Sequence, residues 1–395
     1  MFALSLSSLL WWTAFPAFAH GDRFSLSTLS IAPDAPDMWW GNANGWGVVH
    51  TTDAGANWVW QCEEGLGTQS VNDVLAWDGG TALLATADGA WLVGPSCTVS
   101  ALPGLPADGV VTELARGAGV AFAAVYAEGA GGVYRCDPAD GCVATSLQGL
   151  YIKSIRASAD GGKVWATTVD PASLAAALWV SDDGDTFTVV QEWPAGDADV
   201  RVLHADPERL LVWRLPRSNA AVPTLLFSAD GGGSFVDVHS DGTYTDPVPG
   251  LVVSGNNVWL GSELGRTWRS VDGGRHFFES SETDPAVRCG DTQGAQVLAC
   301  TDHFADGFDI AVWQGGSDWE PRGCLDSAVP ESCAADTCGM YQDAFVSAGA
   351  FGGGLCYAEP DPPAGCGAAQ NASVLPLLFF GARRRKRRLV PHSAC

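Results

Sequence analysis

The chain has 395 residues, of which 47% are hydrophobic, 48 are Gly and 22 are Pro. This composition supplies the core of one large repeat domain or of two ordinary domains. The formal net charge is −24, but residues 383–388 hold six of the 21 Lys and Arg, so the rest of the chain carries 15 basic against 45 acidic groups. Such an acidic body repels phosphate backbones, which argues against nucleic-acid binding; it either keeps an extracellular protein soluble or attracts cations and basic partners.

Residues 1–19 have the pattern of a secretion signal. An apolar stretch includes Leu9, Leu10, Trp11 and Trp12, and Ala17-Phe18-Ala19 forms a small-x-small cleavage site ending at Ala19, although the usual basic start is missing. The chain also contains 12 Cys and no C-x-x-C pair. Cysteines in an exported chain indicate disulfides and an oxidising compartment, so we predict a secreted protein.

Residues 20–323 consist of short apolar runs broken by Gly, Asp, Asn and Pro, which is typical of an all-β domain. One pattern recurs there: an Asp, a Gly two residues later and an aromatic residue five residues after the Asp. Its four copies are Asp53, Gly55 and Trp58; Asp182, Gly184 and Phe187; Asp230, Gly232 and Phe235; and Asp272, Gly274 and Phe277. Their spacing fits a unit of 42 to 48 residues, with the first gap three units long.

The same period locates three weaker copies, near positions 95, 137 and 314. Each unit reads as four short strands with the Asp turn between the third and the fourth. Seven such units closing into a ring predict a seven-bladed β-propeller of four-stranded antiparallel blades. Six or eight blades are the alternatives, because two of the weaker copies rest mainly on spacing.

The four turns resemble the Asp-box, or BNR repeat. In that family the box is the hairpin between the third and fourth strands of a propeller blade, so the resemblance implies structural roles for the turn residues. Asp accepts hydrogen bonds from its own turn, and Gly supplies the positive φ. Families with this repeat include photosystem II assembly factors and sortilin-type receptors, which bind partners, and sialidases and some endoglucanases, which are enzymes.

The sialidase pattern is absent, because Phe24-Ser25-Leu26-Ser27 stands where an Arg-Ile/Leu-Pro motif is expected. A glycosidase needs only two suitably separated carboxylates, so a hydrolase remains the alternative to a binding module. No His-rich cluster or Gly-rich phosphate loop indicates a metal or a cofactor, and we expect neither.

Binding residues are expected in the loops between the second and third strands, which open opposite the Asp turns. These loops contain Asn42, Asn44, Asp88, Glu128, Asp170, Arg217, Asn219, Glu263, Asp302, His303 and Asp306. Five of the seven loops present an acid. We hypothesise an acidic mouth that binds a basic segment, a cation or a polyol; the alternative is an ordinary solvated face.

The cysteine positions predict several disulfides. Cys136 and Cys142 flank the third hairpin, and Cys289 and Cys300 lie on the first two strands of the seventh unit. Cys62 and Cys97 occupy similar positions in neighbouring units. We expect Cys324, Cys333, Cys338 and Cys356 to form two bridges within a Cys-rich appendage at residues 324–358.

The C-terminus reads as a Pro-rich linker at 359–365, then Cys366, an apolar stretch, the basic run and an extension at 389–395. Residues 366–388 resemble the MYXO-CTERM sorting signal, which implies cleavage near Cys366 and delivery to the cell surface. The 15-residue apolar stretch is shorter than the ~20 residues that a membrane span needs, so an unrelated basic tail is the alternative. The sequence as a whole predicts an exported, surface-tethered, non-catalytic module that binds a protein or glycan.

Overall fold

The computed structural model describes residues 25–339 except 69, 129–130, 159, 196–197, 217–221, 241–248, 263–264, 281–283, 303–305, 324, 326–327 and 333–334. The predicted signal peptide, Pro-rich linker, sorting tail and terminal extension lie outside the described residues.

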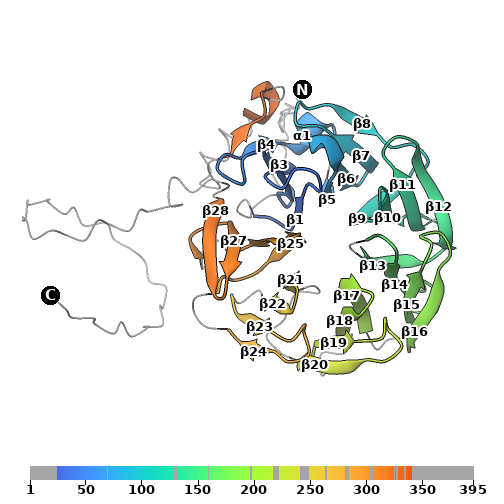
Figure 1. The fold of residues 1–395 in the computed structure, drawn as a ribbon. Coiled ribbons are helices and arrows are strands. Elements are labelled where there is room, and N and C mark those ends of the chain that lie inside the picture. The colour runs from blue at the N-terminus through green and yellow to red at the C-terminus, as the bar shows by residue number, and fades with distance from the viewer. Residues whose placement is uncertain are drawn as a thin grey trace, which may run out of the picture. The chain divides into compact units, whose positions relative to one another are not determined.

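Seven sheets, each with four consecutive antiparallel strands, are arranged in a ring with the first strand of each sheet nearest the centre (Figure 1). Within each sheet the four strands follow one another in chain order, so every blade is formed from one continuous stretch of sequence. The predicted all-β fold, the seven blades and the four strands per blade are therefore confirmed.

The first four blades run as follows. Blade 1 contains β1 (Thr28–Ile31), β2 (Trp39–Asn42), β3 (Val48–Thr51) and β4 (Val59–Gln61). Blade 2 contains β5 (Val71–Ala76), β6 (Ala82–Thr86), β7 (Gly89–Val93) and β8 (Val99–Ala101). Blade 3 contains β9 (Val110–Arg116), β10 (Ala121–Tyr126), β11 (Gly132–Asp137) and β12 (Gly141–Gln148). Blade 4 contains β13 (Tyr151–Ala157), β14 (Val164–Val169), β15 (Ala176–Ser181) and β16 (Thr188–Trp193).

The remaining elements complete the ring. Blade 5 contains β17 (Ala198–Asp206), β18 (Arg209–Pro216), β19 (Thr224–Ser228) and β20 (Val236–Ser240). Blade 6 contains β21 (Gly250–Ser254), β22 (Asn257–Gly261), β23 (Thr267–Ser270) and β24 (Phe278–Glu279). Blade 7 contains β25 (Cys289–Gln293), β26 (Gln296–Cys300), β27 (Ile310–Gly315) and β28 (Asp318–Gly323). A short helix α1 (Glu63–Leu66), a 3₁₀ turn η1 (Asp78–Gly80) and a two-residue strand β29 (Val329–Pro330) are added to these blades.

The core is divided into seven apolar clusters, and each cluster lies between two neighbouring blades. Fully buried tryptophans fill several of these spaces, including Trp39, Trp60, Trp165, Trp213 and Trp259. Large flat side chains suit this position because they cover wide areas of two facing sheets. Each blade thus depends on both neighbours, and the ring must close for the first and last blades to bury their faces.

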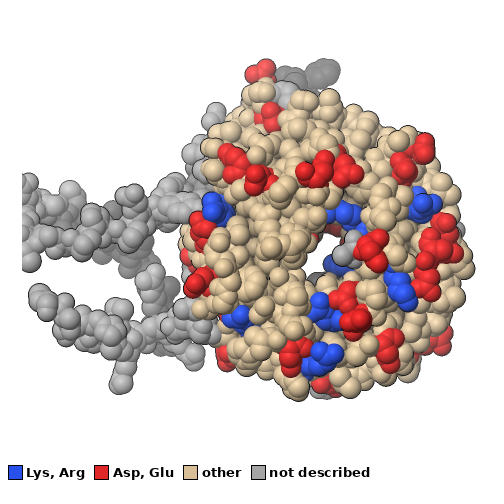
Figure 2. All heavy atoms as spheres, viewed as in Figure 1, with Lys and Arg blue, Asp and Glu red and all other residues tan. Residues whose placement is uncertain are grey.

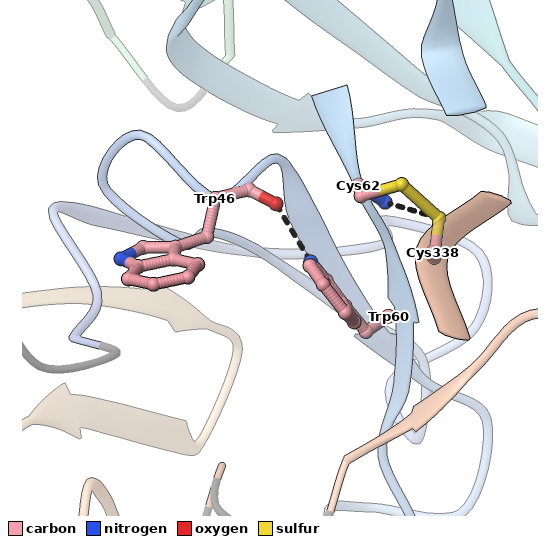
Figure 3. The surroundings of a disulfide bond; sticks show 4 residues. All are labelled: Trp46, Trp60, Cys62 and Cys338. Atoms are coloured by element: carbon pink, nitrogen blue, oxygen red, sulfur yellow. Dashed lines mark hydrogen bonds between the residues drawn. A yellow bond between two sulfur atoms is a disulfide. The ribbon is translucent and has the colours of Figure 1, made fainter. Parts of the chain in front are cut away.

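The residues after blade 7 close the ring by attaching to blade 1. Strand β29 pairs in parallel with β4, and Leu325, Ala328 and Cys338 are buried in the cluster between blades 7 and 1. The Cys62–Cys338 disulfide fixes this segment to the end of β4, next to the bond from the Trp60 indole to the Trp46 carbonyl (Figure 3). We name the described part of residues 325–339 the closing segment.

The disulfides match the predictions in two cases and differ in a third. Cys136–Cys142 spans the hairpin of blade 3, and Cys289–Cys300 joins the first two strands of blade 7, as predicted. Cys338 pairs with Cys62 rather than within the appendage, so that prediction is wrong for Cys338. The physical reason for this pairing is that β29 pairs with β4, which places this part of the appendage against blade 1. Cys97 is also disulfide-bonded, while Cys324, Cys333 and Cys356 lie outside the described residues.

The predicted Asp turns join the third and fourth strands of blades 1, 4, 5 and 6. In blades 1, 5 and 6, a Ser or Thr hydroxyl donates to the Asp carboxylate, which also accepts a backbone N–H four residues further on. The aromatic residue then packs toward the preceding blade in two of these turns: Phe235 contacts Trp193, and Phe277 contacts His239. The turn therefore helps to join adjacent blades as well as the two strands of its own hairpin.

Blade 4 departs from the predicted residue by one position. Ser181 donates to Asp183, and Asp183 accepts the N–H groups of Asp185 and Thr186. Asp182, predicted to be the turn residue, instead forms an exposed ion pair with Lys163. The turn of blade 4 is one residue shorter than the other three. A search for an Asp two residues before the Gly and five before the aromatic residue therefore selects the wrong Asp.

The two adjacent glycines of the blade 5 turn should respond differently to substitution. Both have positive φ, but a Cβ on Gly231 meets open space, whereas a Cβ on Gly232 would lie 2.9 Å from a Leu178 methyl of blade 4. We expect Gly231→Ala to cost about 1 kcal/mol through backbone strain, and Gly232→Ala to cost about 1–3 kcal/mol more through the added overpacking. Urea denaturation of the two variants measures both costs; equal losses would contradict the inter-blade role of this turn.

Candidate binding site in the central channel

The ring encloses a central cavity of about 860 Å³, lined by residues from the first strands of all seven blades. This volume lies within the range of ordinary ligand sites. Figure 2 shows its opening near the centre of the ring, with Lys and Arg on one side of the opening and Asp and Glu beside them. We call this cavity the channel, without implying transport.

Basic residues are concentrated on the channel wall. Six line it: Arg116, Lys153, Arg156, Arg201, Arg209 and Arg288. The acidic residues on the wall are four: Asp73, Glu113, Asp206 and Asp291. The chain before residue 383 has only 15 basic residues but 45 acidic ones. The channel thus reverses the charge balance of the body around it, and this reversal is the main electrostatic feature of the site.

Strand register places the basic residues at the two ends of the channel. The turn end of the channel is the end where turns join the first strand of each blade to the second, and the third strand to the fourth. The loop end is the opposite end, where loops join the second strand of each blade to the third. Arg116, Arg156 and Arg209 lie near the turn end. Arg116 and Arg156 pair with residues at the start of the second strand of their blades, and Arg209 is itself the first residue of the second strand of blade 5. Arg201 and Lys153 lie closer to the loop end, and Arg288 directly precedes β25 at that end.

At the turn end the arginines connect neighbouring blades. Arg116 of blade 3 donates through Nη2 to the Ile31 carbonyl of blade 1 at 3.0 Å and to the Ala76 carbonyl of blade 2 at 2.5 Å. Arg156 of blade 4 pairs with Glu113 of blade 3 and donates to a carbonyl of blade 5. Arg209 holds Asp206 and donates to the Gly255 carbonyl of blade 6. These three guanidinium groups therefore all make contacts between blades, although the Nε of Arg116 is buried without a hydrogen-bond partner.

Polar side chains on the first strands also connect neighbouring blades, by accepting backbone hydrogen bonds. Asp73 accepts the N–H of Leu114, Glu113 accepts that of Ile155, and Asp291 accepts that of Ile31. In each case the N–H belongs to the first strand of the next blade, with blade 7 followed by blade 1. Ser154 makes the equivalent contact with Val202. Such contacts satisfy backbone donors that would otherwise be unpaired at the inner edges of the sheets.

Burial, together with the charge of Glu113, raises the pKa of Asp73 to about 6. Because the folded-state pKa exceeds the unfolded value of 3.8, folding favours the protonated form, and the stability contributed by this group is lost as pH rises from about 4 to 6. We expect the unfolding free energy of the wild type, relative to Asp73→Asn, to fall by about 2 kcal/mol from pH 4 to pH 7. Urea denaturation across this pH range measures the difference; a difference independent of pH would contradict the assignment.

At the loop end the basic groups are less fully engaged. Lys153 pairs with Asp199 at 3.0 Å, and Arg201 donates through Nη1 to the Lys153 carbonyl at 3.2 Å. Arg288 pairs with Asp302 of the blade 7 loop. The Nε of Arg201 is buried without a hydrogen-bond partner. Among the described residues, Arg201 forms no salt bridge.

The same end of the molecule exposes large apolar and aromatic side chains on blades 3, 4 and 5. Tyr126 and Tyr151 are 51% and 40% exposed and lie with ring centroids 5.3 Å apart. Tyr151 pairs in register with Val169, which directly precedes the blade 4 loop, and Tyr126 ends β10. Leu174 and Val222, in the loops of blades 4 and 5, are also exposed. This side of the loop end therefore combines apolar surface with the nearby cations Lys153 and Arg201.

The loop residues predicted from sequence have different surroundings. Asn44, Asp88 and Glu128 are exposed. Asn42 is buried and donates to the Val71 carbonyl of blade 2. Asp170 accepts two N–H groups of its own loop. Asp302 pairs with Arg288, while Asp306 accepts two backbone N–H groups and burial raises its pKa to about 6. Arg217, Asn219, Glu263 and His303 lie outside the described residues.

Within the described part of the chain, no group of three or more His, Cys, Asp or Glu side chains is placed to hold a metal ion. The helices in this part are also too short or too polar to cross a bilayer.

The sequence matches no protein-family model and no curated protein. The fold is similar to solved structures that include "YCF48 bound to D1 peptide", with 16% identity and a TM-score of 0.47 over 71% of this chain and 91% of that one. YCF48 from Cyanidioschyzon merolae matches with 13% identity and a TM-score of 0.48, over 71% of this chain and 93% of that one. A chain of a nidogen/laminin complex matches with 13% identity and a TM-score of 0.42, over 63% and 95%.

Proposed function

We propose that this chain is an exported, surface-tethered Asp-box propeller that acts as a non-catalytic binding or scaffolding module for a protein or glycan. Its ligand binds at the loop end of the channel. The observation that carries the proposal is the concentration of basic groups on the channel wall of an otherwise acidic body. Six basic residues against four acidic ones leave an excess of positive charge on the wall, and such an excess in a cleft favours a ligand of opposite charge.

The carboxylates of the channel favour binding over hydrolysis. Asp73 and Glu113 interact electrostatically, and the pKa of Asp73 is raised, which is a pattern that glycosidases also use. Here, however, both Asp73 oxygens accept backbone N–H groups, from Val74 and Leu114. The Glu113 oxygens contact Ile155 and Arg156. A carboxylate whose oxygens are committed to contacts with the backbone or with an arginine is poorly placed to donate a proton to a substrate.

Export and surface attachment rest on the two ends of the chain, at Ala19 and Cys366. If the proposal is correct, protein released from the cell surface has the mass of a chain starting at residue 20 and ending near Cys366. Mass spectrometry of the mature protein measures this directly. A surface protein that retains the basic run 383–388 would contradict the sorting step.

Photo-cross-linking tests the binding site in the producing cell. A benzophenone amino acid at Asp88 lies in an exposed loop at the loop end, whereas the same group at Glu208 lies in an exposed turn at the turn end. We expect one adduct of defined mass from position 88 and none from position 208. No adduct at position 88, or equal adducts from both positions, would contradict a binding face at the loop end.

A further inference from the structure

We propose that the segment bound at the loop end of the channel is an acidic peptide: a short extended stretch whose Asp or Glu carboxylates contact Arg201 and Lys153. The inference deepens the proposed function and rests on it. The acidic loops suggested a basic ligand, whereas the charges of the channel wall lead us to propose an acidic one.

Arg201 is the channel cation with the greatest unused capacity among those at the loop end. A guanidinium presents five N–H donors in a planar fork that matches a carboxylate. In Arg201, Nη1 donates to the Lys153 carbonyl, while Nη2 forms no hydrogen bond with the described residues and, unlike Nε, is not buried. Each turn-end arginine donates through its terminal nitrogens to a carbonyl or carboxylate of an adjacent blade, although the Nε of Arg116 also lacks a partner. A ligand carboxylate would supply the acceptor that Arg201 lacks.

Lys153 gives the site a second positive group on the adjacent blade. Its Nζ lies 3.0 Å from Asp199 Oδ2, and both side chains keep more than one-fifth of their surface exposed. An ammonium group has three donors, so this contact leaves capacity for a ligand carboxylate. Together, Lys153 and Arg201 place two cations on neighbouring first strands, as an acidic segment crossing from blade 4 to blade 5 requires.

The surroundings favour a peptide over an anionic glycan. The first strands are the inner edge strands of their sheets, but the N–H groups of Ile155 and Val202 are already paired with Glu113 and Ser154, so we expect the ligand to be held mainly by side chains. Bulges interrupt the register of β13 between Ile152 and Ser154 and of β17 between Val202 and His204. A bulge leaves one residue outside the regular pairing. The exposed Tyr126–Tyr151 pair adds apolar surface for a peptide side chain.

The test is fluorescence anisotropy of fluorescein-labelled hexaglutamate, added to the propeller at physiological ionic strength, which screens the long-range charge of the acidic body. Hexalysine is the probe of opposite charge, and an oligogalacturonate is the anionic glycan. We expect hexaglutamate to bind, hexalysine not to bind, and the oligogalacturonate to bind more weakly than hexaglutamate. Arg201→Gln should weaken hexaglutamate binding about tenfold, since a hydrogen bond to a charged group is lost.

Lys163→Gln is the matched control. It removes one positive charge from the same body, but Lys163 lies in an exposed turn and pairs with Asp182. We expect binding by this variant to stay within twofold of the wild type. Hexalysine binding, preferred oligogalacturonate binding, or equal effects of the two variants would each overturn the proposal.

The two proposals fail in distinguishable ways. If cross-linking from position 88 yields its adduct while hexaglutamate fails to bind, the binding module stands and the acidic peptide is wrong. If position 88 yields no adduct, the proposed function itself is contradicted. Thermal melting of Arg201→Gln, expected to match the wild type within a few degrees, separates lost binding from lost folding.

Discussion

Replacing Arg116 by Met should lower the unfolding free energy by about 2–4 kcal/mol, because buried polar groups lose their partner. The guanidinium of Arg116 donates to carbonyls of blades 1 and 2 from its own place in blade 3. Burial lowers the pKa of Arg116 and raises that of Asp291, while the attraction between the two charges opposes both shifts. Removing Arg116 therefore leaves two carbonyls and a buried carboxylate without this compensation.

Methionine keeps much of the apolar stem of arginine, so the variant tests the polar contacts rather than the packing. Arg135→Met is the matched control, because Arg135 lies exposed on β11 of the same blade. Its substitution should change the unfolding free energy by no more than about 0.5 kcal/mol. Equal losses in the two variants, measured by urea denaturation, would refute the inter-blade role of Arg116.

Loss of the Cys62–Cys338 disulfide should destabilise the propeller more than loss of Cys136–Cys142. The first bridge joins residues 276 apart in sequence and the second joins residues six apart. In the chain-entropy model this difference makes the long-range bridge about 3 kcal/mol more stabilising. The long-range bridge also attaches the closing segment to blade 1, where it covers the cluster shared with blade 7.

The two bridges form a matched comparison, since all four cysteines are buried. We expect the Cys62→Ser, Cys338→Ser double variant to melt well below the Cys136→Ser, Cys142→Ser double variant in calorimetry under oxidising conditions. The same melting temperature for both would contradict the role of the closing segment in holding the ring shut.

The blade count could be predicted from the sequence because the Asp turns are local. Asp53, Gly55 and Trp58 lie within six residues, and their chemistry depends on one hairpin, so their repetition marks each blade independently of the rest of the fold. The same locality caused the error at Asp182: the offsets of Gly184 and Phe187 do not reveal that the turn is one residue shorter. Ser181, which donates to Asp183, carries the information that the simpler pattern omitted.

The channel residues could not be predicted in the same way. Which side chains of an inner strand face the centre depends on strict alternation, and the bulges near Lys153 and Leu203 interrupt it. The partner of Cys338 depends on β29 pairing with β4, a contact between the two ends of the described chain. Asn42 was expected in an open loop, but it ends β2 and is buried against blade 2.

The most direct test of a binding site at the loop end combines the benzophenone group at position 88 with the Arg201→Gln substitution in the channel. The yield of the adduct formed from position 88 can be compared in the wild-type, Arg201→Gln and Lys163→Gln backgrounds. A site at the loop end of the channel predicts a large loss of adduct with Arg201→Gln and an unchanged yield with Lys163→Gln. An undiminished adduct in the Arg201→Gln background would show that the partner binds without the channel and would contradict this account.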